Sequence, residues 1–465
     1  MVDAADYFQI AQAAMMNAKQ RIMLIGWDFD TRITLSRDRR RPGSAPNRLG
    51  EFITWLADRT PGLEIKILKW NFGALKMLGR GSTVLDLARW TMHPQIEFKL
   101  DGAHPIGCSH HQKLLVIDDR FAVCGGIDMT SDRWDTSEHL DEDRRRRRPN
   151  GKPYGPWHDV TMVVENEAAA ALGALARARW ERAGGASLQP CKPQAESPWP
   201  AFVQAEFQFV ELGISRTRAE YEDCPGIFEI ENLFLEQIAR AKNFIYAENQ
   251  YFASRKIAEA IALRLSEPNP PEVFIVTAEK ADGWLEQKAM DSARARLVRA
   301  VGEKDLQGKF SVNIPYTANG APIYVHSKVM IVDDEVLRIG SANMNNRSLG
   351  LDSECDLHID ATKPGNESAG GAITRLRYSL LAEHCGVSAE MMEKALSTGC
   401  TMRNAVDSFV RSGRSLRRLI LEELSETERQ LADQAMLDPE APEEFFEPFA
   451  KRSIFARSRV LDAPD

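Results

Sequence analysis

The sequence lacks the features of a secreted or membrane-spanning protein. No stretch reaches the ~18 uninterrupted apolar residues that a transmembrane helix needs. Residues 1–6 carry acid where a signal peptide carries base. The seven cysteines are odd in number and never form a Cys-x-x-Cys pair, which argues against a disulfide framework or a zinc knuckle. We therefore expect a cytoplasmic protein, with peripheral attachment to a membrane left open.

An excess of positive charge is also missing. The formal net charge is −8 at pH 7, so no general polyanion-binding surface is expected and a nucleic-acid partner is disfavoured. The apolar and charged fractions are those of a globular protein. At 465 residues the chain is too long for one ordinary core, so two domains or two fused repeats are expected.

What the sequence does contain is an internal repeat. Residues 7–29 have the pattern of an amphipathic helix followed by an apolar strand, and residues 230–252 have the same pattern. Each half continues with a second helix and a second apolar strand, at 49–58 and 63–68 in the first and at 255–266 and 272–276 in the second. Short apolar runs that alternate with helices predict crossover units and a largely parallel, buried sheet.

The clearest correspondence aligns residues 111–133 with residues 326–348. The matched positions are His111 with His326, Lys113 with Lys328, Asp118 with Asp333, Gly125 with Gly340, and Met129 with Met344. Between each Lys and Asp lies a four-residue apolar run that predicts a core strand. Two such matches, flanked by helices and strands in the same order, are not easily accidental.

The composition also suggests domain boundaries. A proline-rich stretch predicts a linker at 189–204 between a first domain, 1–188, and a second domain, 205–370. Residues 371–465 have a helical, charged pattern with no partner in the first half, and we interpret them as a helical C-terminal extension. The arginine run at 144–148 is more typical of a solvated loop than of a lipid-headgroup contact.

The His-x-Lys spacing predicts a phosphate site. In an extended strand residues i and i+2 face the same side, so each His projects together with its Lys. The ammonium offsets the charge of the phosphate, and the imidazole can attack or transfer a proton. Two histidines in opposite protonation states permit a two-step displacement, one attacking phosphorus and the other protonating the leaving alcohol. Two half-sites related by a pseudo-two-fold axis would supply that pair without a metal or a cofactor.

Other polar residues are assigned supporting roles. Asp128 and Asn343, with the two lysines, are candidates for holding the equatorial phosphate oxygens. Asp159 and Glu354 each precede an apolar strand, and are candidates for accepting a hydrogen bond from the far nitrogen of each catalytic His. Asp118 and Asp333 belong to the catalytic motifs, but because they follow buried strands we expect them to brace a turn. A metal site could also be considered at His104, His110, His111 and Asp118. It is disfavoured because the ammonium group of Lys113 would occupy the place of the metal cation.

With their Gly-Gly and Gly-Ser-Ala-Asn followers, the two motifs resemble the paired signature of the phospholipase D superfamily. The likeness covers roughly residues 5–365; it includes the segments 26–30, 104–105, 133–135, 248–252 and 345–348. The resemblance implies an α/β fold of two similar domains, each a mixed sheet between helices, with one metal-free site at their interface. It also implies that His111 is the nucleophile and His326 the general acid, although the residues alone permit the reverse.

Three enzyme classes share such a site. We favour a phospholipase D that acts on glycerophospholipids at a membrane surface, by hydrolysis or transphosphatidylation through a phosphohistidine. A cardiolipin or phosphatidylserine synthase-type phosphatidyltransferase is the alternative, although cardiolipin synthases of the superfamily usually begin with membrane helices. A nuclease is less favoured because such members are often single-motif dimers or more basic. One chain holds both half-sites, so we expect a monomer, and the intact motifs disfavour a non-catalytic scaffold.

Overall fold

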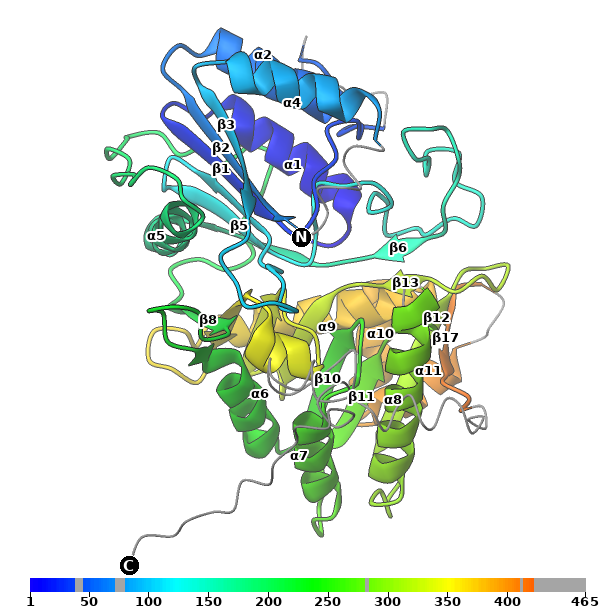
Figure 1. Cartoon of the computed structure of the whole chain (residues 1–465). Coiled ribbons are helices and arrows are strands. Elements are labelled where there is room, and N and C mark those ends of the chain that lie inside the picture. Colours follow the sequence, from blue (N-terminus) through cyan, green and yellow to red (C-terminus); the bar gives the residue numbers. More distant parts are fainter. Residues whose placement is uncertain (38–44, 72–79, 281–283, 410–412, 422–465) are drawn as a thin grey trace, which may run out of the picture.

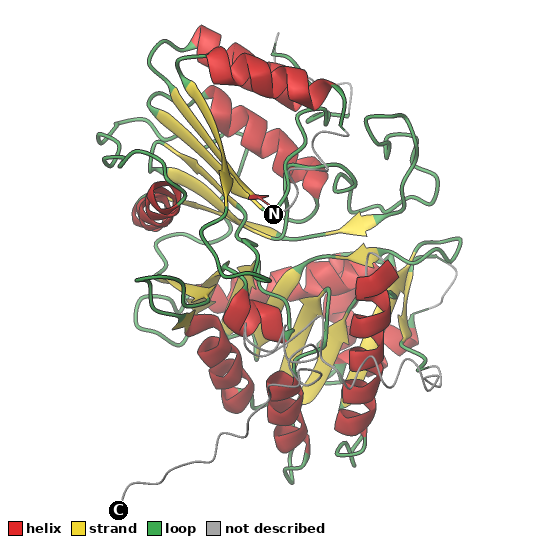
Figure 2. Cartoon of the chain, in the orientation of Figure 1, coloured by secondary structure: helices red, strands yellow, loops and turns green. Residues whose placement is uncertain are grey.

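The protein consists of two sheet-centred halves stacked face to face, with helices outside and between them (Figures 1 and 2). This computed structural model describes residues 1–37, 45–71, 80–280, 284–409 and 413–421. No helix within those ranges is both long and apolar enough to cross a membrane.

The first half is built on a six-stranded sheet in the order β3-β2-β1-β4-β5-β7. Its strands are β1 (Arg21–Gly26), β2 (Glu64–Trp70), β3 (Ile96–Asp101), β4 (Leu114–Ile117), β5 (Phe121–Gly125) and β7 (Thr161–Glu165). Its helices are α1 (Ala4–Met16), α2 (Leu49–Arg59) and α4 (Ser82–Met92) on the outer face and α5 (Glu167–Arg182) on the inner face (Figure 1). Side chains alternate along β1, so Ile22 and Leu24 pack under α1 while Met23 and Ile25 face the other half.

The second half repeats this plan in a nine-stranded sheet, β17-β12-β11-β10-β14-β15-β16-β8-β9. Its strands are β8 (Leu212–Arg218), β9 (Ile227–Phe228), β10 (Phe244–Asn249), β11 (Glu272–Val276), β12 (Phe310–Tyr316), β14 (Lys328–Val332), β15 (Val336–Gly340), β16 (Glu354–Asp360) and β17 (Ser415–Arg418). Its outer helices are α6 (Glu229–Arg240), α7 (Arg255–Leu265) and α8 (Trp284–Gly302). A π-helical turn, η2 (Arg347–Leu351), precedes β16.

Six strands of each sheet correspond in neighbour order, β3-β2-β1-β4-β5-β7 matching β12-β11-β10-β14-β15-β16. The predicted α/β fold of two similar halves is therefore confirmed. The prediction of a largely parallel sheet was wrong. Within the described parts of the two large sheets, only β1, β2 and β3, and their counterparts, pair in parallel. The rest pair antiparallel, since β4 and β5 are joined by a tight turn and not by a helical crossover.

The C-terminal region is not a separate helical extension in its described part. Helix α9 (Ala369–Cys385) follows β16 as α5 follows β7, so it is the counterpart of a first-half helix, contrary to our interpretation. Among the described residues after α9, the elements without a first-half counterpart are α10 (Ala389–Leu396), α11 (Met402–Ser408) and β17, and β17 pairs antiparallel with β12. The predicted boundary at residue 370 therefore falls at the start of α9, and residues 422–465 lie outside the described ranges.

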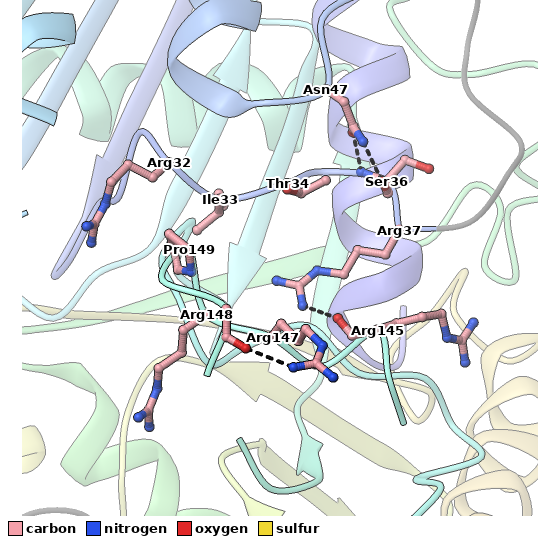
Figure 3. A pocket seen from close by; sticks show the side chains of 11 residues that line it. Arg32, Ile33, Thr34, Ser36, Arg37, Asn47, Arg145, Arg147, Arg148 and Pro149 are labelled. Carbon is pink, nitrogen blue, oxygen red and sulfur yellow. Dashed lines mark hydrogen bonds between the residues drawn. The ribbon is translucent and has the colours of Figure 1, made fainter. Parts of the chain in front are cut away.

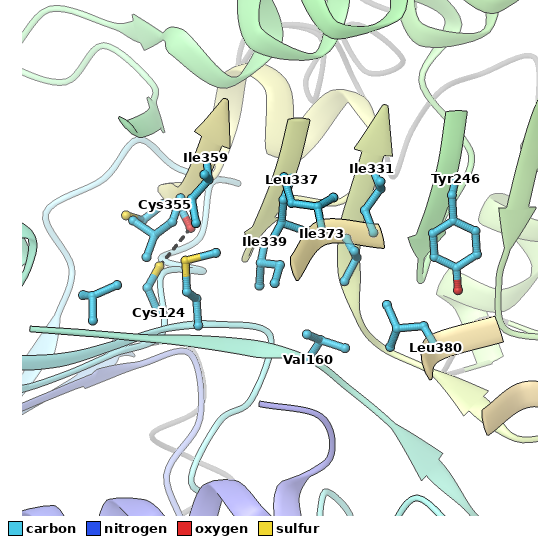
Figure 4. Close-up of a cluster of buried hydrophobic side chains, with 14 of the residues drawn as sticks. Cys124, Val160, Tyr246, Ile331, Leu337, Ile339, Cys355, Ile359, Ile373 and Leu380 are labelled. Carbon is cyan, nitrogen blue, oxygen red and sulfur yellow. Dashed lines mark hydrogen bonds between the residues drawn. The ribbon is translucent and has the colours of Figure 1, made fainter. Parts of the chain in front are cut away.

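The two halves share one apolar core. Figure 4 shows Cys124 and Val160 of the first half opposite Leu337, Ile339 and Cys355 of the second. Helices α5 and α9 complete this layer. The Cys124 thiol donates a hydrogen bond to the Cys355 carbonyl oxygen at 3.3 Å. Because the halves share a core, the strand ends that carry the two motifs have a defined position relative to each other.

Candidate active site

Each His-x-Lys segment forms backbone hydrogen bonds with the opposite half. The His111 N–H donates to the Ser353 carbonyl oxygen at 2.9 Å, and the His326 N–H donates to the His158 carbonyl oxygen at 2.8 Å. The second contact extends a parallel pair of short strands, β6 (Trp157–His158) and β13 (Tyr324–Val325). The two motifs therefore meet at the interface between the halves, each beside the segment that carries the other half's acid.

Those acids hold the imidazoles. Nδ1 of His111 lies 3.0 Å from both carboxylate oxygens of Glu354. Nδ1 of His326 lies 2.7 Å from Oδ2 of Asp159. Each carboxylate comes from the half opposite to its His, and each contacts Nδ1, so that Nε2 is the ring nitrogen left for chemistry.

The carboxylates of Glu354 and Asp159 accept further hydrogen bonds from groups other than the histidines. The hydroxyls of Ser341 and Ser348 donate to Glu354, the latter at 2.6 Å. The Val160 N–H donates to Oδ1 of Asp159 at 2.8 Å. These contacts fix the carboxylates because both side chains are fully buried. Sequence reasoning missed the two serines, whose only signal was their place in and just after the second motif.

The two lysines have different partners. Nζ of Lys113 lies 3.2 Å from Oδ2 of Asp128, whereas Nζ of Lys328 lies 3.3 Å from the amide oxygen of Gln250. Asp128 also accepts a hydrogen bond from the Trp27 N–H at 3.0 Å. The structure thus places Asp128 against Lys113, as its charge partner.

The second motif carries no such acid, because Asn343 occupies the position of Asp128. Its Nδ2 lies 3.5 Å from Oε1 of Gln250. Gln250 is a site residue that sequence reasoning did not single out, although it lies in the matched segment 248–252. Because Lys328 has an amide partner instead of a carboxylate, its charge is the less compensated of the two.

Burial controls the protonation of the site. It lowers the pKa of His111 and His326, and the ammonium groups of Lys113 and Lys328 lower both further. Burial also raises the pKa of Asp159 to about 7 and that of Glu354 to about 8. Each His–carboxyl pair therefore favours a state without net charge, in which one proton is shared between the two groups. An anionic phosphate would shift that balance toward a protonated imidazole.

Burial lowers the pKa of Lys328 as well, to about 7, although the charge of Asp159 opposes this shift. The ammonium form of Lys328 is thus favoured by an incoming anion. A lysine pKa that is lowered in this way is typical of a functional site that binds a negatively charged ligand.

Asp118 and Asp333 lie at the opposite end of β4 and β14 from the lysines. The Asp118 carboxylate accepts hydrogen bonds from the backbone N–H groups of Lys19, Gln20 and Arg21, at 2.7–2.8 Å. Asp333 does the same for the backbone of residues 242–244. Both brace the start of the neighbouring strand, which is β1 in the first half and its counterpart β10 in the second, in keeping with their position after a buried strand. They do not face the histidines, so the structure gives them no direct part in the chemistry.

Aromatic rings flank the two histidines. The Trp27 ring meets His111 edge-on at 6.5 Å, and the Trp157 ring lies 5.1 Å from that of His326. The Arg133 guanidinium lies over Trp157, 4.2 Å from the ring centroid. The four residues of the disfavoured metal cluster do not come together, because Nε2 of His110 lies 3.0 Å from Oδ1 of Asp101 while Asp118 lies at the far end of β4.

The arginine run contributes to a basic cavity of about 740 Å³ in the first half. Its lining includes Arg145, Arg147 and Arg148 from the loop, and Arg32 and Arg37 from the segment after β1 (Figure 3). Carboxylates pair with some of these; Arg148 contacts Asp132 at 2.8 Å. The Arg147 guanidinium instead donates to the carbonyl oxygens of Arg144 and Gly151.

Together, fold and site define a two-domain α/β protein with one His-Lys pair from each domain at a shared interface. A family model described as Phospholipase D matches residues 304–429. Phospholipase D alpha 1 of Ricinus communis is 26% identical over 84% of this chain, and that of Nicotiana tabacum is 25% identical over 84%. The chain spans 65% of the length of each of these relatives.

A solved structure shares the fold. The crystal structure of phosphatidylserine synthase from Haemophilus influenzae Rd KW20 superposes with a TM-score of 0.57 at 14% identity, covering 93% of this chain and 92% of that one. The family model, the plant relatives and the doubled motif agree in supporting the phospholipase D superfamily as the family of this chain.

Proposed function

We propose that the protein is a phospholipase D-type enzyme that cleaves the phosphodiester of glycerophospholipids, by hydrolysis or by transfer to an alcohol. One observation carries the proposal: each catalytic His is held at Nδ1 by a carboxylate of the opposite half. This arrangement supplies two oriented imidazoles and two ammonium groups at one interface. Those are the parts that a two-step displacement at phosphorus requires.

In the first step Nε2 of His111 attacks phosphorus, and the bond from phosphorus to the headgroup oxygen breaks. The negative charge of the bound phosphate favours the protonated form of His326. The headgroup oxygen therefore takes its proton from Nε2 of His326. Lys113 and Lys328 offset the negative charge on the equatorial oxygens. The products are a phosphatidyl-histidine and the free headgroup alcohol.

In the second step neutral His326 acts as a base. It takes a proton from water or from an alcohol, whose oxygen attacks phosphorus while the bond from phosphorus to His111 breaks. Water yields phosphatidic acid, and an alcohol yields a new phosphatidyl ester. Both outcomes return the two histidines to their starting states, so one site can perform hydrolysis and transphosphatidylation.

The lipid substrate is proposed from the names of the plant relatives and from the basic cavity. The cavity can contact anionic headgroups of a membrane surface, where arginines contribute about 1 kcal/mol each. Arg147→Glu reverses one charge there and should weaken sedimentation with vesicles of phosphatidylcholine and phosphatidylglycerol. Arg255→Glu is the matched control, because that side chain is exposed on α7 of the other half.

The deciding experiment is a phospholipid panel with and without ethanol, read by mass spectrometry. We expect phosphatidic acid in water and phosphatidylethanol when ethanol is added. His111→Ala and His326→Ala should each abolish both products, whereas His93→Ala, on the surface beside Asp58, should not. Release of nucleotides from DNA without lipid turnover would overturn the substrate, and full activity of either active-site variant would overturn the mechanism.

A further inference from the structure

The proposed chemistry leaves one cation beside the site without a role, the guanidinium of Arg133. The side chain is half-buried, and its Nε is buried and makes no hydrogen bond among the described residues. The described part of the chain also places no carboxylate within salt-bridge distance of it, whereas Arg148 of the following loop contacts Asp132 at 2.8 Å. Keeping an unpaired guanidinium in a partly desolvated position costs free energy, which a negatively charged ligand would offset.

The internal repeat shows that this position differs between the halves. Arg133 corresponds to Ser348 in the alignment of residues 111–133 with residues 326–348. Ser348 donates a hydrogen bond to Glu354, the carboxylate that holds the first catalytic His. In the described structure no such bond joins Arg133 to Asp159, the equivalent carboxylate of the first half, which accepts instead from a backbone N–H. Arg133 therefore does not share the supporting role of its counterpart.

Arg133 lies on the side of the site where the leaving group departs. Its guanidinium is 4.2 Å from the centroid of the Trp157 ring, and that ring is 5.1 Å from the ring of His326. Trp157 also stacks on Tyr324 at 4.5 Å, and the Tyr324 hydroxyl accepts a hydrogen bond from Nε2 of Gln250 at 3.0 Å. These contacts form a continuous wall beside His326. Because His326 protonates the headgroup oxygen in the proposed mechanism, this wall borders the headgroup.

The charge of Arg133 acts on this half-site. Burial lowers the pKa of His326, and the charges of Lys328 and then Arg133 lower it further, ahead of the charge of Lys113. Burial also lowers the pKa of His111, where the charges that contribute most are those of Lys113 and Lys328. Arg133 is thus a third cation of the site, and its influence is directed to the headgroup side.

The balance of charges allows for a second negative group in the substrate. Lys113 is paired with Asp128, and each His–carboxyl pair favours a state without net charge. A phosphodiester carries one negative charge, which the ammonium group of Lys328 offsets. The guanidinium of Arg133 then remains as an uncompensated positive charge next to the headgroup.

We propose that Arg133 selects the headgroup: its guanidinium binds a carboxylate or a phosphate that the headgroup carries in addition to the scissile phosphate. The inference rests on the proposed function, because it takes the side of His326 as the headgroup side. A guanidinium binds either anion through parallel N–H donors. A headgroup whose only charge is an ammonium is disfavoured there, because a cation beside Trp157 would meet the positive charge of Arg133.

The test compares lipids that differ by one charged group. Phosphatidylserine differs from phosphatidylethanolamine by a headgroup carboxylate, and phosphatidylglycerophosphate differs from phosphatidylglycerol by a headgroup phosphate. Short-chain lipids are used as soluble monomers, so that attraction of the protein to a charged membrane surface does not contribute. For the full-length wild type we expect kcat/KM to be about tenfold or more higher for the anionic member of at least one pair. Equal values within both pairs would refute the role of Arg133 and leave the proposed function intact, whereas no turnover of any lipid would overturn both.

Variants assign the preference to this side chain. Arg133→Gln should reduce the ratio of kcat/KM within the preferred pair to within about threefold of unity, and Arg133→Lys should keep part of it. Arg59→Gln is the matched control and should keep the full ratio, because Arg59 also lies over a tryptophan, 5.0 Å from the Trp55 ring, but is exposed on α2. An equal loss for both lipids of a pair, with the ratio unchanged, would contradict the proposal, since it would indicate a structural role or a contact with the scissile phosphate. If circular dichroism shows that Arg133→Gln does not fold, the ratio in Arg133→Lys decides.

Discussion

Glu354→Gln tests the cross-domain support of the proposed nucleophile. In the wild type both carboxylate oxygens lie 3.0 Å from Nδ1 of His111, and two serine hydroxyls donate to them. A Gln amide offers one acceptor oxygen and one donor nitrogen in the same space. Either the amide nitrogen faces Nδ1, or a serine hydroxyl must turn to accept. The variant therefore keeps the shape of the side chain but loses the charge and one acceptor.

The magnitude follows from the lost hydrogen bond. A buried hydrogen bond to a charged group contributes ~1.5–3 kcal/mol. The transition state of the first step places positive charge on the His111 ring, so this contribution is larger there than in the ground state. At about 1.4 kcal/mol per factor of ten, we expect kcat to fall roughly 10–150-fold with little change in KM.

The assay is steady-state turnover of a short-chain phosphatidylcholine, with acid-quench trapping of the phosphoenzyme. Trapping should show slower formation of the intermediate in Glu354→Gln. Ser348→Ala is the matched control: it removes one donor but leaves the carboxylate, and should cost about tenfold or less. A kcat within about threefold of wild type for Glu354→Gln would refute the orienting role.

Three further predictions concern the rest of the site. Asp118→Ala leaves three backbone N–H groups without their acceptor, so the free energy of unfolding should fall by ~2–4 kcal/mol in urea titrations, while the kcat of the folded fraction stays within about threefold; unchanged stability would contradict the bracing role. Gly126→Ala places a Cβ 2.1 Å from Oδ1 of Asp159, so kcat should fall about tenfold or more; Gly155→Ala, with open space around it, should be neutral, and equal rates would contradict the close approach. Because Lys328 has a pKa of about 7 and binds phosphate in its charged form, kcat/KM should decline about tenfold per pH unit above that value, and a flat profile to pH 9 would contradict this.

Much of the fold could be predicted because its signals are local. Apolar runs predicted strands at 114–117 and 272–276, which are the bounds of β4 and β11. The internal repeat predicted two similar halves. Strand direction was predicted wrongly, because an apolar run does not show whether a strand is parallel or antiparallel to its neighbour. The connection between the two strands determines that. The correspondence of α9 with α5 was missed, because the two helices occupy equivalent positions in the fold but have no recognisable sequence pattern in common.

Within the site, the sequence by itself determined the two His-x-Lys pairs, because residues two apart on a strand must face the same side. It also identified Asp159 and Glu354 as candidate partners, but not which His each would hold. Only the tertiary structure decided that, since the contacts join residues 243 and 167 positions apart. Because the two sheets stack on each other, the carboxylate from each half contacts the imidazole of the other half and orients it.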